Sequence, residues 1–380
     1  MGSRSAVIVG IGRTAYRRGS GRTTLGMATE ACRAALDDAG MPVSEVDGIV
    51  CFSTGDSVIP ILVGYALGLD GLAYPLEIKG GGNYASIVVA QAVAAVEAGM
   101  CETALVYRSL NSLSGHRYGR VDGALVAEGH IQYGAPHGYL VPGQWFAMMA
   151  RRHMHDYGST YEDLGHVAIQ TRAHAANNPH AILRTPITMD DYLDSRWIYD
   201  PFRIYDCALE ADGAAAVLVT TAERARDLKQ PAVRMLGHAA WLGAGGLPDQ
   251  WPDMSALYSA NVGPRLWDMT GLTPGDMDLA CLYDCFTYTT LATLEDYGFC
   301  GKGEAGRFFA DGRATYGGDV VVNPHGGLLS EAYIHGMNHH FEAVLQLRGQ
   351  AGERQVKDAA LCLVSAGTGP YGGALVYGRD

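Results

Sequence analysis

The 380-residue sequence lacks a signal-like N-terminus and any apolar run of about 18 residues or more, so we expect neither secretion nor a membrane span but a cytoplasmic protein. Basic residues are scarce: 28 Lys and Arg stand against 40 Asp and Glu, for a formal net charge of −12. Because nucleic acids and anionic membrane surfaces attract positive charge, this balance excludes both as partners. An anionic substrate needs a local basic pocket, or a partner that supplies one.

Paired cysteines are also missing. None of the eight cysteines forms a C-x-x-C motif, and most lie inside apolar runs, which predicts reduced core thiols. Cys281 and Cys285 stand four apart but have no second pair, so the sequence predicts no zinc site.

Glycine and tyrosine are abundant. The chain holds 50 Gly, which predicts many tight turns and close backbone approaches. Its 21 Tyr against 8 Phe favour cavities that are apolar but carry a few hydroxyl groups.

Hydrophobic periodicity predicts an α/β protein. In the first half, strands and helices alternate, which is typical of a parallel sheet. We expect strands at residues 5–11, 47–52, 75–79, 103–107 and 212–220, and helices at 24–39 and 84–98. Between residues 109 and about 195 this alternation breaks around one helix at 144–157, which indicates an insertion above a site.

The second half repeats the same order of elements, which indicates an internal duplication around a pseudo-twofold axis. We expect strands at residues 232–236, 279–283, 320–322, 359–365 and 374–377, and helices at 256–270, 288–297 and 338–347. The predicted division is residues 1–230, with an insertion at about 109–200, and residues 231–380. In such a duplicate the last loops of the two halves should converge.

The most informative stretch is N-P-H-G-G-L-L-S-E-A-Y-I-H-G at residues 323–336. It joins a predicted strand to a helix that we expect to begin near Tyr333. Side chains and free N–H groups at such a turn lie at the carboxyl edge of a sheet, where α/β proteins bind ligands.

Four motifs in the same order resemble the thiolase superfamily, and most closely its lipid-transfer, sterol-carrier-like branch. They are G-G-G-N-Y-A-S before the buried helix, Y-D-C-F-T at 283–287, N-P-H-G-G-L, and S-A-G-T-G-P-Y-G-G at 365–373. The resemblance implies a five-layer αβαβα fold of two related halves, an inserted loop domain and a homodimer.

The departures from the thiolase pattern remove its chemistry. Residues 80–84 hold no nucleophilic Cys, and Tyr283 begins the box that a thiolase starts with Asn or His. Tyr333 replaces the His of the G-H-P triplet, and Ser365 replaces the late Cys. A covalent acyl-enzyme is therefore unsupported.

The tyrosine pattern is similar to that of thiolase-fold retro-aldolases of steroid side-chain degradation. The resemblance implies cleavage of a steroid 17-hydroxy-20-carboxyl-CoA β-hydroxyacyl thioester to a 17-ketosteroid and propionyl-CoA. It also implies a separate acyl-CoA-binding subunit with an OB fold and a zinc ribbon. No cofactor is expected in this chain, and any zinc would belong to that subunit.

A retro-aldol reaction needs a base for the β-hydroxyl, donors for the enolate oxygen and an acid for the enolate carbon, but no nucleophile. We assign Tyr283 and Tyr333 to the acid–base work, with a lowered phenol pKa as the requirement for a base. The supporting or substrate-binding candidates are Asp284, His325, Gly326, Gly327, His335 and Ser365. Two alternatives stay open: a thiolase-like acyltransferase with an atypical site, and a non-catalytic acyl-CoA-binding or lipid-binding subunit.

Other side chains carry weaker signals. Arg151, Arg152 and Arg172 are candidates for CoA phosphates, although a solvated helix face explains them as well. His153 and His155 point in different directions on a helix, which argues against a metal site, and we assign Cys207 to the core.

Overall fold

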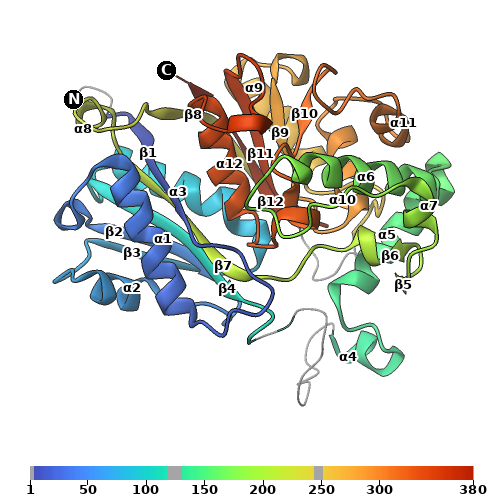
Figure 1. Cartoon of the computed structure of the whole chain (residues 1–380), viewed down its shortest axis with the longest axis horizontal. Coiled ribbons are helices and arrows are strands. Elements are labelled where there is room, and N and C mark those ends of the chain that lie inside the picture. Colours follow the sequence, from blue (N-terminus) through green and yellow to red (C-terminus); the bar gives the residue numbers. More distant parts are fainter. Residues whose placement is uncertain (1–3, 116, 118–130, 244–250, 380) are drawn as a thin grey trace.

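A computed structural model describes residues 4–115, 117, 131–243 and 251–379. Its centre is one ten-stranded sheet in the order β10-β9-β11-β12-β8-β1-β7-β4-β2-β3 (Figure 1). The first half contributes β1 (Ala6–Arg13), β2 (Gly48–Ser53), β3 (Tyr74–Lys79), β4 (Thr103–Asn111) and β7 (Asp212–Thr221). The second contributes β8 (Val233–Leu242), β9 (Leu279–Cys281), β10 (Val321–Val322), β11 (Leu361–Thr368) and β12 (Tyr371–Arg379).

The strand order repeats between the two halves. Outward from the centre, the first half reads β1-β7-β4-β2-β3 and the second reads β8-β12-β11-β9-β10. In each half four strands run in one direction and a single strand, β7 or β12, runs in the opposite direction, so the expectation of a purely parallel sheet is wrong. The halves join where β1 and β8 pair at Val7 with Arg234 and at Ile8 with Val233.

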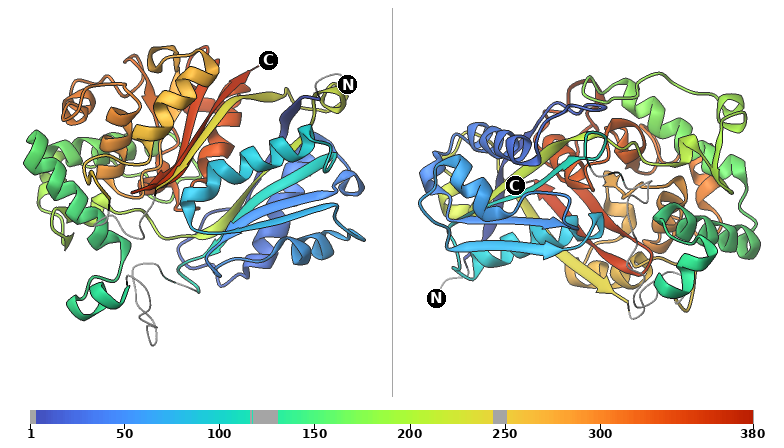
Figure 2. Two further views of the ribbon diagram at one scale, coloured as in Figure 1. Left: turned by 180° about the vertical axis from the view of Figure 1, so that it is seen from behind. Right: turned by 90° about the horizontal axis from the view of Figure 1, so that it is seen from below.

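Helices complete the five layers that the resemblance implied (Figure 2). Helix α1 (Thr24–Ala39) and helix α2 (Pro60–Leu67) cover the outer face of the first half, and α9 (Ser259–Thr270) covers the second, beside α10 (Thr287–Asp296). Between the halves lie α3 (Ala85–Glu97) and α12 (Met337–Leu347), and both pack on strands of each half. This central position explains why α3 is apolar on nearly every face.

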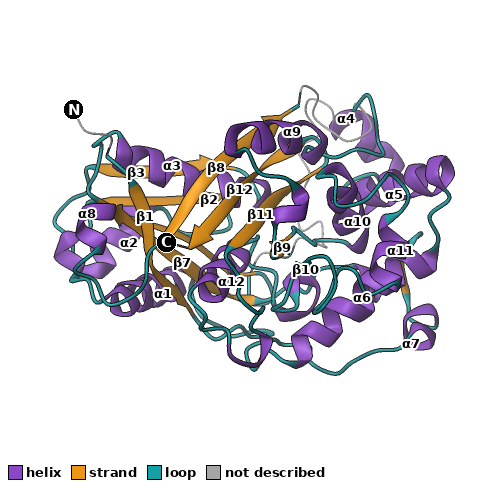
Figure 3. Cartoon of the chain, turned by 90° about the horizontal axis from the view of Figure 1, so that it is seen from above, coloured by secondary structure: helices purple, strands orange, loops and turns teal. Residues whose placement is uncertain are grey.

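The inserted region crosses to the opposite half (Figure 3). It contains α4 (Ile131–Gly134), α5 (Pro142–Tyr157), α6 (Tyr161–Ala176), α7 (Met189–Leu193) and the ribbon β5 (Trp197–Tyr199) with β6 (Phe202–Arg203). Helix α6 packs on α10 and on α11 (Ala305–Ala310), which both belong to the second half. Outside the insertion, the short helix α8 (Ala222–Ala225) follows β7. The sequence predicted one helix here, but α6 is a second long one; residues 116 and 118–130 of the predicted insertion lie outside the described residues.

The core is apolar, with free thiols. All eight cysteines are unpaired; six are buried, and Cys207 and Cys300 are half-buried. Among the described residues, no helix combines the length and the apolar character that a membrane crossing needs.

Candidate active site

Asn323 fixes the position of the first tyrosine loop. Its side chain mimics a further strand residue: Oδ1 accepts from the N–H of Leu282 at 2.9 Å, and Nδ2 donates to the Leu282 carbonyl at 3.0 Å. The ends of β9 and β10 therefore stay side by side beyond their last ladder pair. This clamp brings Tyr283 against the loop at residues 323–336.

Asp284 and Gly327 build the turn between β10 and α12. The Asp284 carboxylate accepts from the N–H groups of Leu328 at 2.8 Å and Leu329 at 3.4 Å. Gly327 has φ +57°, and a Cβ there would lie well under 3.0 Å from the Asp284 carboxylate. Asp284, Gly326 and Gly327 are buried and are not among the residues that line the cavity, so their contacts shape the loop.

Beyond this turn the chain runs extended through Tyr333, and α12 begins at Met337 rather than near Tyr333 as predicted. The segment at residues 208–210, which the sequence did not single out, contacts both tyrosine loops. The N–H of Ala208 donates to the Cys285 carbonyl at 2.9 Å, and the N–H of Tyr333 donates to the Leu209 carbonyl at 3.0 Å. The segment that leads from the insertion back to β7 thus helps to fix the site.

The structure brings Tyr283 and Tyr333 together: their hydroxyl oxygens are 3.0 Å apart and share one hydrogen bond. Their rings meet edge to face with centroids 6.2 Å apart, and the Oγ of Ser365 accepts from the N–H of Tyr283 at 3.3 Å. Burial raises the pKa of both phenols, although Arg108 opposes the rise. Both are therefore neutral at pH 7, and the lowered pKa expected for a tyrosinate base is absent.

Both tyrosines line a cavity of about 600 Å³, within the usual range for small-molecule sites. Its walls come from the carboxyl ends of β2, β3 and β9, from the insertion and from the turn between β11 and β12, in accord with the predicted sheet edge. Much of the wall is aromatic or aliphatic, through Val141, Pro142, Trp145, Phe146, Ile198, Tyr199, Ile204, Phe286, Pro370 and Tyr371.

Gly82 explains how Tyr283 fits. It lies just before α3, in the segment where the thiolase pattern leads one to expect the nucleophile. A Cβ at residue 82 would lie well under 3.0 Å from the hydroxyl and ring of Tyr283. The Tyr283 hydroxyl therefore fills the space that a side chain at residue 82 would need. A side chain at residue 82 and Tyr283 in this position exclude each other.

Two cysteines reach the cavity, Cys207 and Cys285. Cys207 packs against the core of the second half, as assigned, but it is half-buried and also lines the cavity. Burial raises the pKa of both thiols. Their polar contacts are the Arg203 carbonyl, 3.6 Å from Cys207 Sγ, and the Thr289 hydroxyl, 3.8 Å from Cys285 Sγ. Neither contact activates a thiolate.

His325 was expected to face the site, and this expectation is wrong. The ring is fully buried and its Nε2 lies 2.9 Å from Nδ1 of His339, away from the cavity wall.

His335 does line the cavity, beside Tyr333. Beside it lies Arg108, which was not among the expected site residues, although an arginine directly after the expected strand at residues 103–107 was a usable signal.

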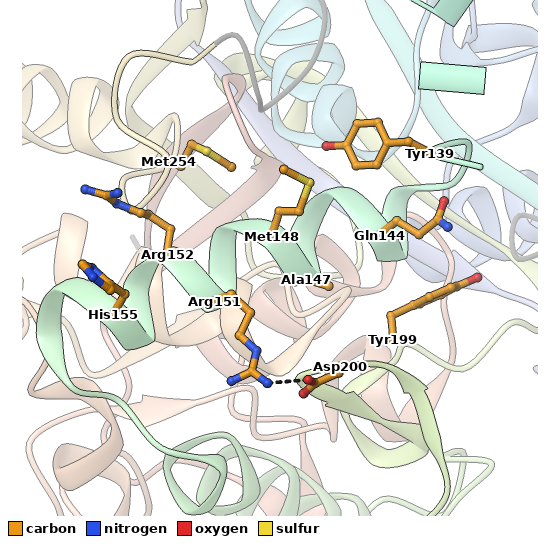
Figure 4. Close-up of a pocket in the computed structure, with 10 residues that line it drawn as sticks. All are labelled: Tyr139, Gln144, Ala147, Met148, Arg151, Arg152, His155, Tyr199, Asp200 and Met254. Atoms are coloured by element: carbon orange, nitrogen blue, oxygen red, sulfur yellow. Dashed lines mark hydrogen bonds and ion pairs between the residues drawn. The ribbon is translucent and has the colours of Figure 1, made fainter. Parts of the chain in front are cut away.

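A second hollow of about 630 Å³ lies on the outer side of α5 and is more open (Figure 4). Figure 4 shows Arg151 and Arg152 pointing to different sides of the helix. Arg151 pairs with Asp200, and Arg152 pairs with Asp156 at 2.6 Å. Both are exposed, as a solvated face predicts. Arg172 is not: it is buried and donates to the Ser330 hydroxyl at 2.9 Å.

Comparison with known proteins places this site in a family. Residues 247–378 match the model of the thiolase C-terminal domain-like family. The chain is 43% identical over 390 residues to the 17-hydroxy-3-oxo-4-pregnene-20-carboxyl-CoA lyase of Mycobacterium tuberculosis, across 99% of this chain and 100% of the relative. The chain belongs to the steroid side-chain-cleaving aldolase family of the thiolase superfamily. It is an enzyme of the carbon–carbon lyase class.

A second relative and a solved structure match this chain over nearly the full length of each. A steroid side-chain-cleaving aldolase of Thermomonospora curvata is 42% identical, across 99% of this chain and 98% of its own. The solved structure named Ltp2-ChsH2(DUF35) aldolase superposes with a TM-score of 0.93 at 42% identity, across 99% of this chain and 98% of that chain. The resemblance noted from four motifs is thus confirmed.

Proposed function

We propose that the chain cleaves a steroid 17-hydroxy-20-carboxyl-CoA thioester by a retro-aldol reaction, releasing a 17-ketosteroid and propionyl-CoA. The observation that carries this is the pair of tyrosine hydroxyls, 3.0 Å apart, in a largely apolar cavity whose thiols are not activated. The names of the close relatives support the substrate class. The test is mass spectrometry of products from such a thioester, which should show both products in equal amounts; an unchanged substrate would contradict the proposal.

The two neutral phenols act as one proton relay. The proton of the 17-hydroxyl passes to the oxygen of one tyrosine while that tyrosine passes its own proton to the other. The second tyrosine protonates the α-carbon of the thioester. The O–H electrons form the new C=O bond, and the electrons of the broken C–C bond pass through the enolate into the new C–H bond. Neither tyrosine needs to ionise and no covalent intermediate forms, so the chain needs no cofactor for this step.

The relay predicts a flat pH profile for kcat between about pH 6 and pH 9. Burial keeps the pKa of Tyr283 and Tyr333 above the usual value of about 10, so both stay protonated across this range. A tyrosinate base would instead make kcat rise about tenfold per pH unit below its pKa. Steady-state kcat measured at fixed ionic strength distinguishes the two profiles.

An acyltransferase mechanism makes a different prediction at the cavity thiols. With Cys207→Ala and Cys285→Ala, separately and together, we expect kcat to stay within about threefold of the wild type, because neither sulfur takes part in the relay. Circular dichroism at the assay temperature checks that each variant is folded. A loss of 10²-fold or more in a folded variant would favour covalent catalysis through that thiol.

We propose a homodimer formed through the first half-sheet. Strand β3 ends the sheet, and α2 beside it exposes Ile61 (62%), Leu62 (48%) and Tyr65 (82%). Exposed edges and apolar patches favour association. Light scattering after gel filtration should give a dimer that Tyr65→Glu converts to a monomer, whereas Met269→Glu, on the equally exposed face of α9, leaves it dimeric. A monomeric wild type would contradict this.

We also propose a complex with an OB-fold, zinc-ribbon acyl-CoA-binding protein. The support is the solved aldolase whose name includes a DUF35 component. Co-expression with such a protein encoded beside this chain should yield one co-purifying complex with a higher turnover than the chain alone. Independent elution of the two would contradict the proposal.

A further inference from the structure

The retro-aldol reaction leaves one requirement that the tyrosine pair does not meet. As the C–C bond breaks, negative charge develops on the thioester oxygen, and that oxygen needs a fixed hydrogen-bond donor. Both tyrosine hydroxyls are committed to moving the proton. A third polar group at the same wall of the cavity is therefore required, and His335 lies there with its ring centroid 4.7 Å from that of Tyr333.

A buried guanidinium sets the hydrogen-bonding state of His335. Arg108 has no exposed surface, and its Nη2 and Nε lie 2.9 Å and 3.3 Å from Nδ1 of His335. A guanidinium can only donate, so Nδ1 must be the acceptor and carries no proton. In a neutral imidazole the proton is then on Nε2.

The surroundings of Arg108 keep this arrangement in place. Asp56 accepts from Nη2 at 2.7 Å, and the carbonyl of Phe52 accepts from Nη1 at 2.8 Å. The Phe52 ring stacks on His335 with the planes 17° apart. Burial alone would raise the pKa of Asp56, but the ion pair with Arg108 outweighs it and lowers that pKa, so the carboxylate is charged. Burial and Arg108 lower the pKa of His335, so the ring is neutral.

The backbone conformation of His335 also supports a functional role for this residue. His335 has φ +50°, a left-handed conformation that few residues with a side chain adopt. Such strain persists where the surroundings hold it, and it gathers at functional sites. His335 is among the residues that line the cavity and Arg108 is not. The guanidinium contacts the ring at Nδ1, and Nε2 is the ring nitrogen on the other side from that contact.

We propose that Arg108, held by Asp56, is a positioning residue that fixes His335 as the Nε2–H tautomer, and that this N–H is the donor for the thioester oxygen as it becomes an enolate. The inference deepens the proposed retro-aldol function and rests on it. His335 then touches the substrate, while Arg108 and Asp56 act only through His335.

The tautomer can be tested without any turnover. Proton–nitrogen NMR of the ¹⁵N-histidine-labelled full chain, with the His335 signals assigned from their loss in His335→Gln, should show a proton on Nε2 and none on Nδ1 from pH 6 to pH 8. Among the residues that the structure describes, the charged and titratable groups that face the ring include Arg108, Asp56 and Tyr333, with Tyr283 beyond Tyr333. A proton on Nδ1, or an imidazolium, at pH 7 would overturn the inference whatever the enzyme catalyses.

Kinetics test the role of the donor. His335→Ala should lower kcat about 10²-fold to 10³-fold with little change in KM, the loss typical of one oxyanion donor. His335→Gln restores an amide N–H at a similar reach and should recover at least tenfold of that loss. An alanine variant within threefold of the wild type, or a glutamine variant no better than alanine, would overturn the donor role while leaving the proposed cleavage itself intact.

Discussion

Tyr283→Phe and Tyr333→Phe are each expected to lower kcat by about 10²-fold or more while KM changes little. Each substitution removes one hydroxyl from the 3.0 Å pair and so interrupts the transfer of the proton from the β-hydroxyl to the α-carbon. Substrate binding relies on the apolar wall, which a phenyl ring preserves. Release of the 17-ketosteroid under saturating substrate measures the effect.

A matched control separates chemistry from packing. Tyr297 is a tyrosine of the same half, fully buried away from the cavity, and its hydroxyl donates to that of Tyr258 at 3.4 Å. Tyr297→Phe should therefore keep kcat within about threefold of the wild type. Near-wild-type rates for both Tyr283→Phe and Tyr333→Phe would remove the tyrosines from the mechanism.

Gly82→Ala is expected to abolish measurable cleavage, with a loss of about 10³-fold or more. The added methyl group would occupy the position of the Tyr283 hydroxyl, so the ring must move and the contact with Tyr333 is lost. A displacement of about 1 Å in a catalytic group is enough to cost 10²-fold in rate. The steady-state rate and the thermal unfolding midpoint should be measured together.

Gly81→Ala is the matched control, since Gly81 is adjacent in sequence and also lines the cavity. Its φ is −86°, and the nearest atom to an added Cβ is the Asn83 side-chain oxygen at 3.5 Å, an ordinary contact. We expect at least a third of the wild-type rate. A Gly82→Ala enzyme as active as Gly81→Ala would show that the tyrosine need not occupy this space.

Much of the fold could be read from the sequence because periodicity and motif order report it directly. The all-round apolar helix at residues 84–98 predicted a buried position, and α3 lies between the two half-sheets. The antiparallel strands could not be read in this way. Strand β7 returns from the long insertion and β12 from the turn at Gly369 and Pro370, and alternating apolar residues do not encode the direction of pairing.

The positions of the candidate site residues were predictable where a motif places a side chain beside a strand end. Tyr283 and Tyr333 follow β9 and β10, and the Asn323 clamp brings their loops together. His325 was misplaced because its ring points into the core and meets His339 on α12 at 2.9 Å, and the motif alone does not show to which side of the turn this side chain points. Arg108 and Asp56 were missed because their link to His335 spans more than 200 residues of sequence, and pairing at that separation is a property of the fold alone.

The central claim is that two neutral tyrosines form a single relay, and a double-substitution cycle tests it most directly. The kcat values of Tyr283→Phe, Tyr333→Phe and the double variant are measured under one set of conditions. The relay predicts that the kcat of the double variant lies within about threefold of that of the slower single variant. Either substitution alone already interrupts the transfer of the proton, so the second one costs little more. Two independent groups would instead multiply their losses. A double-variant kcat lower by the product of the two single losses would contradict the relay.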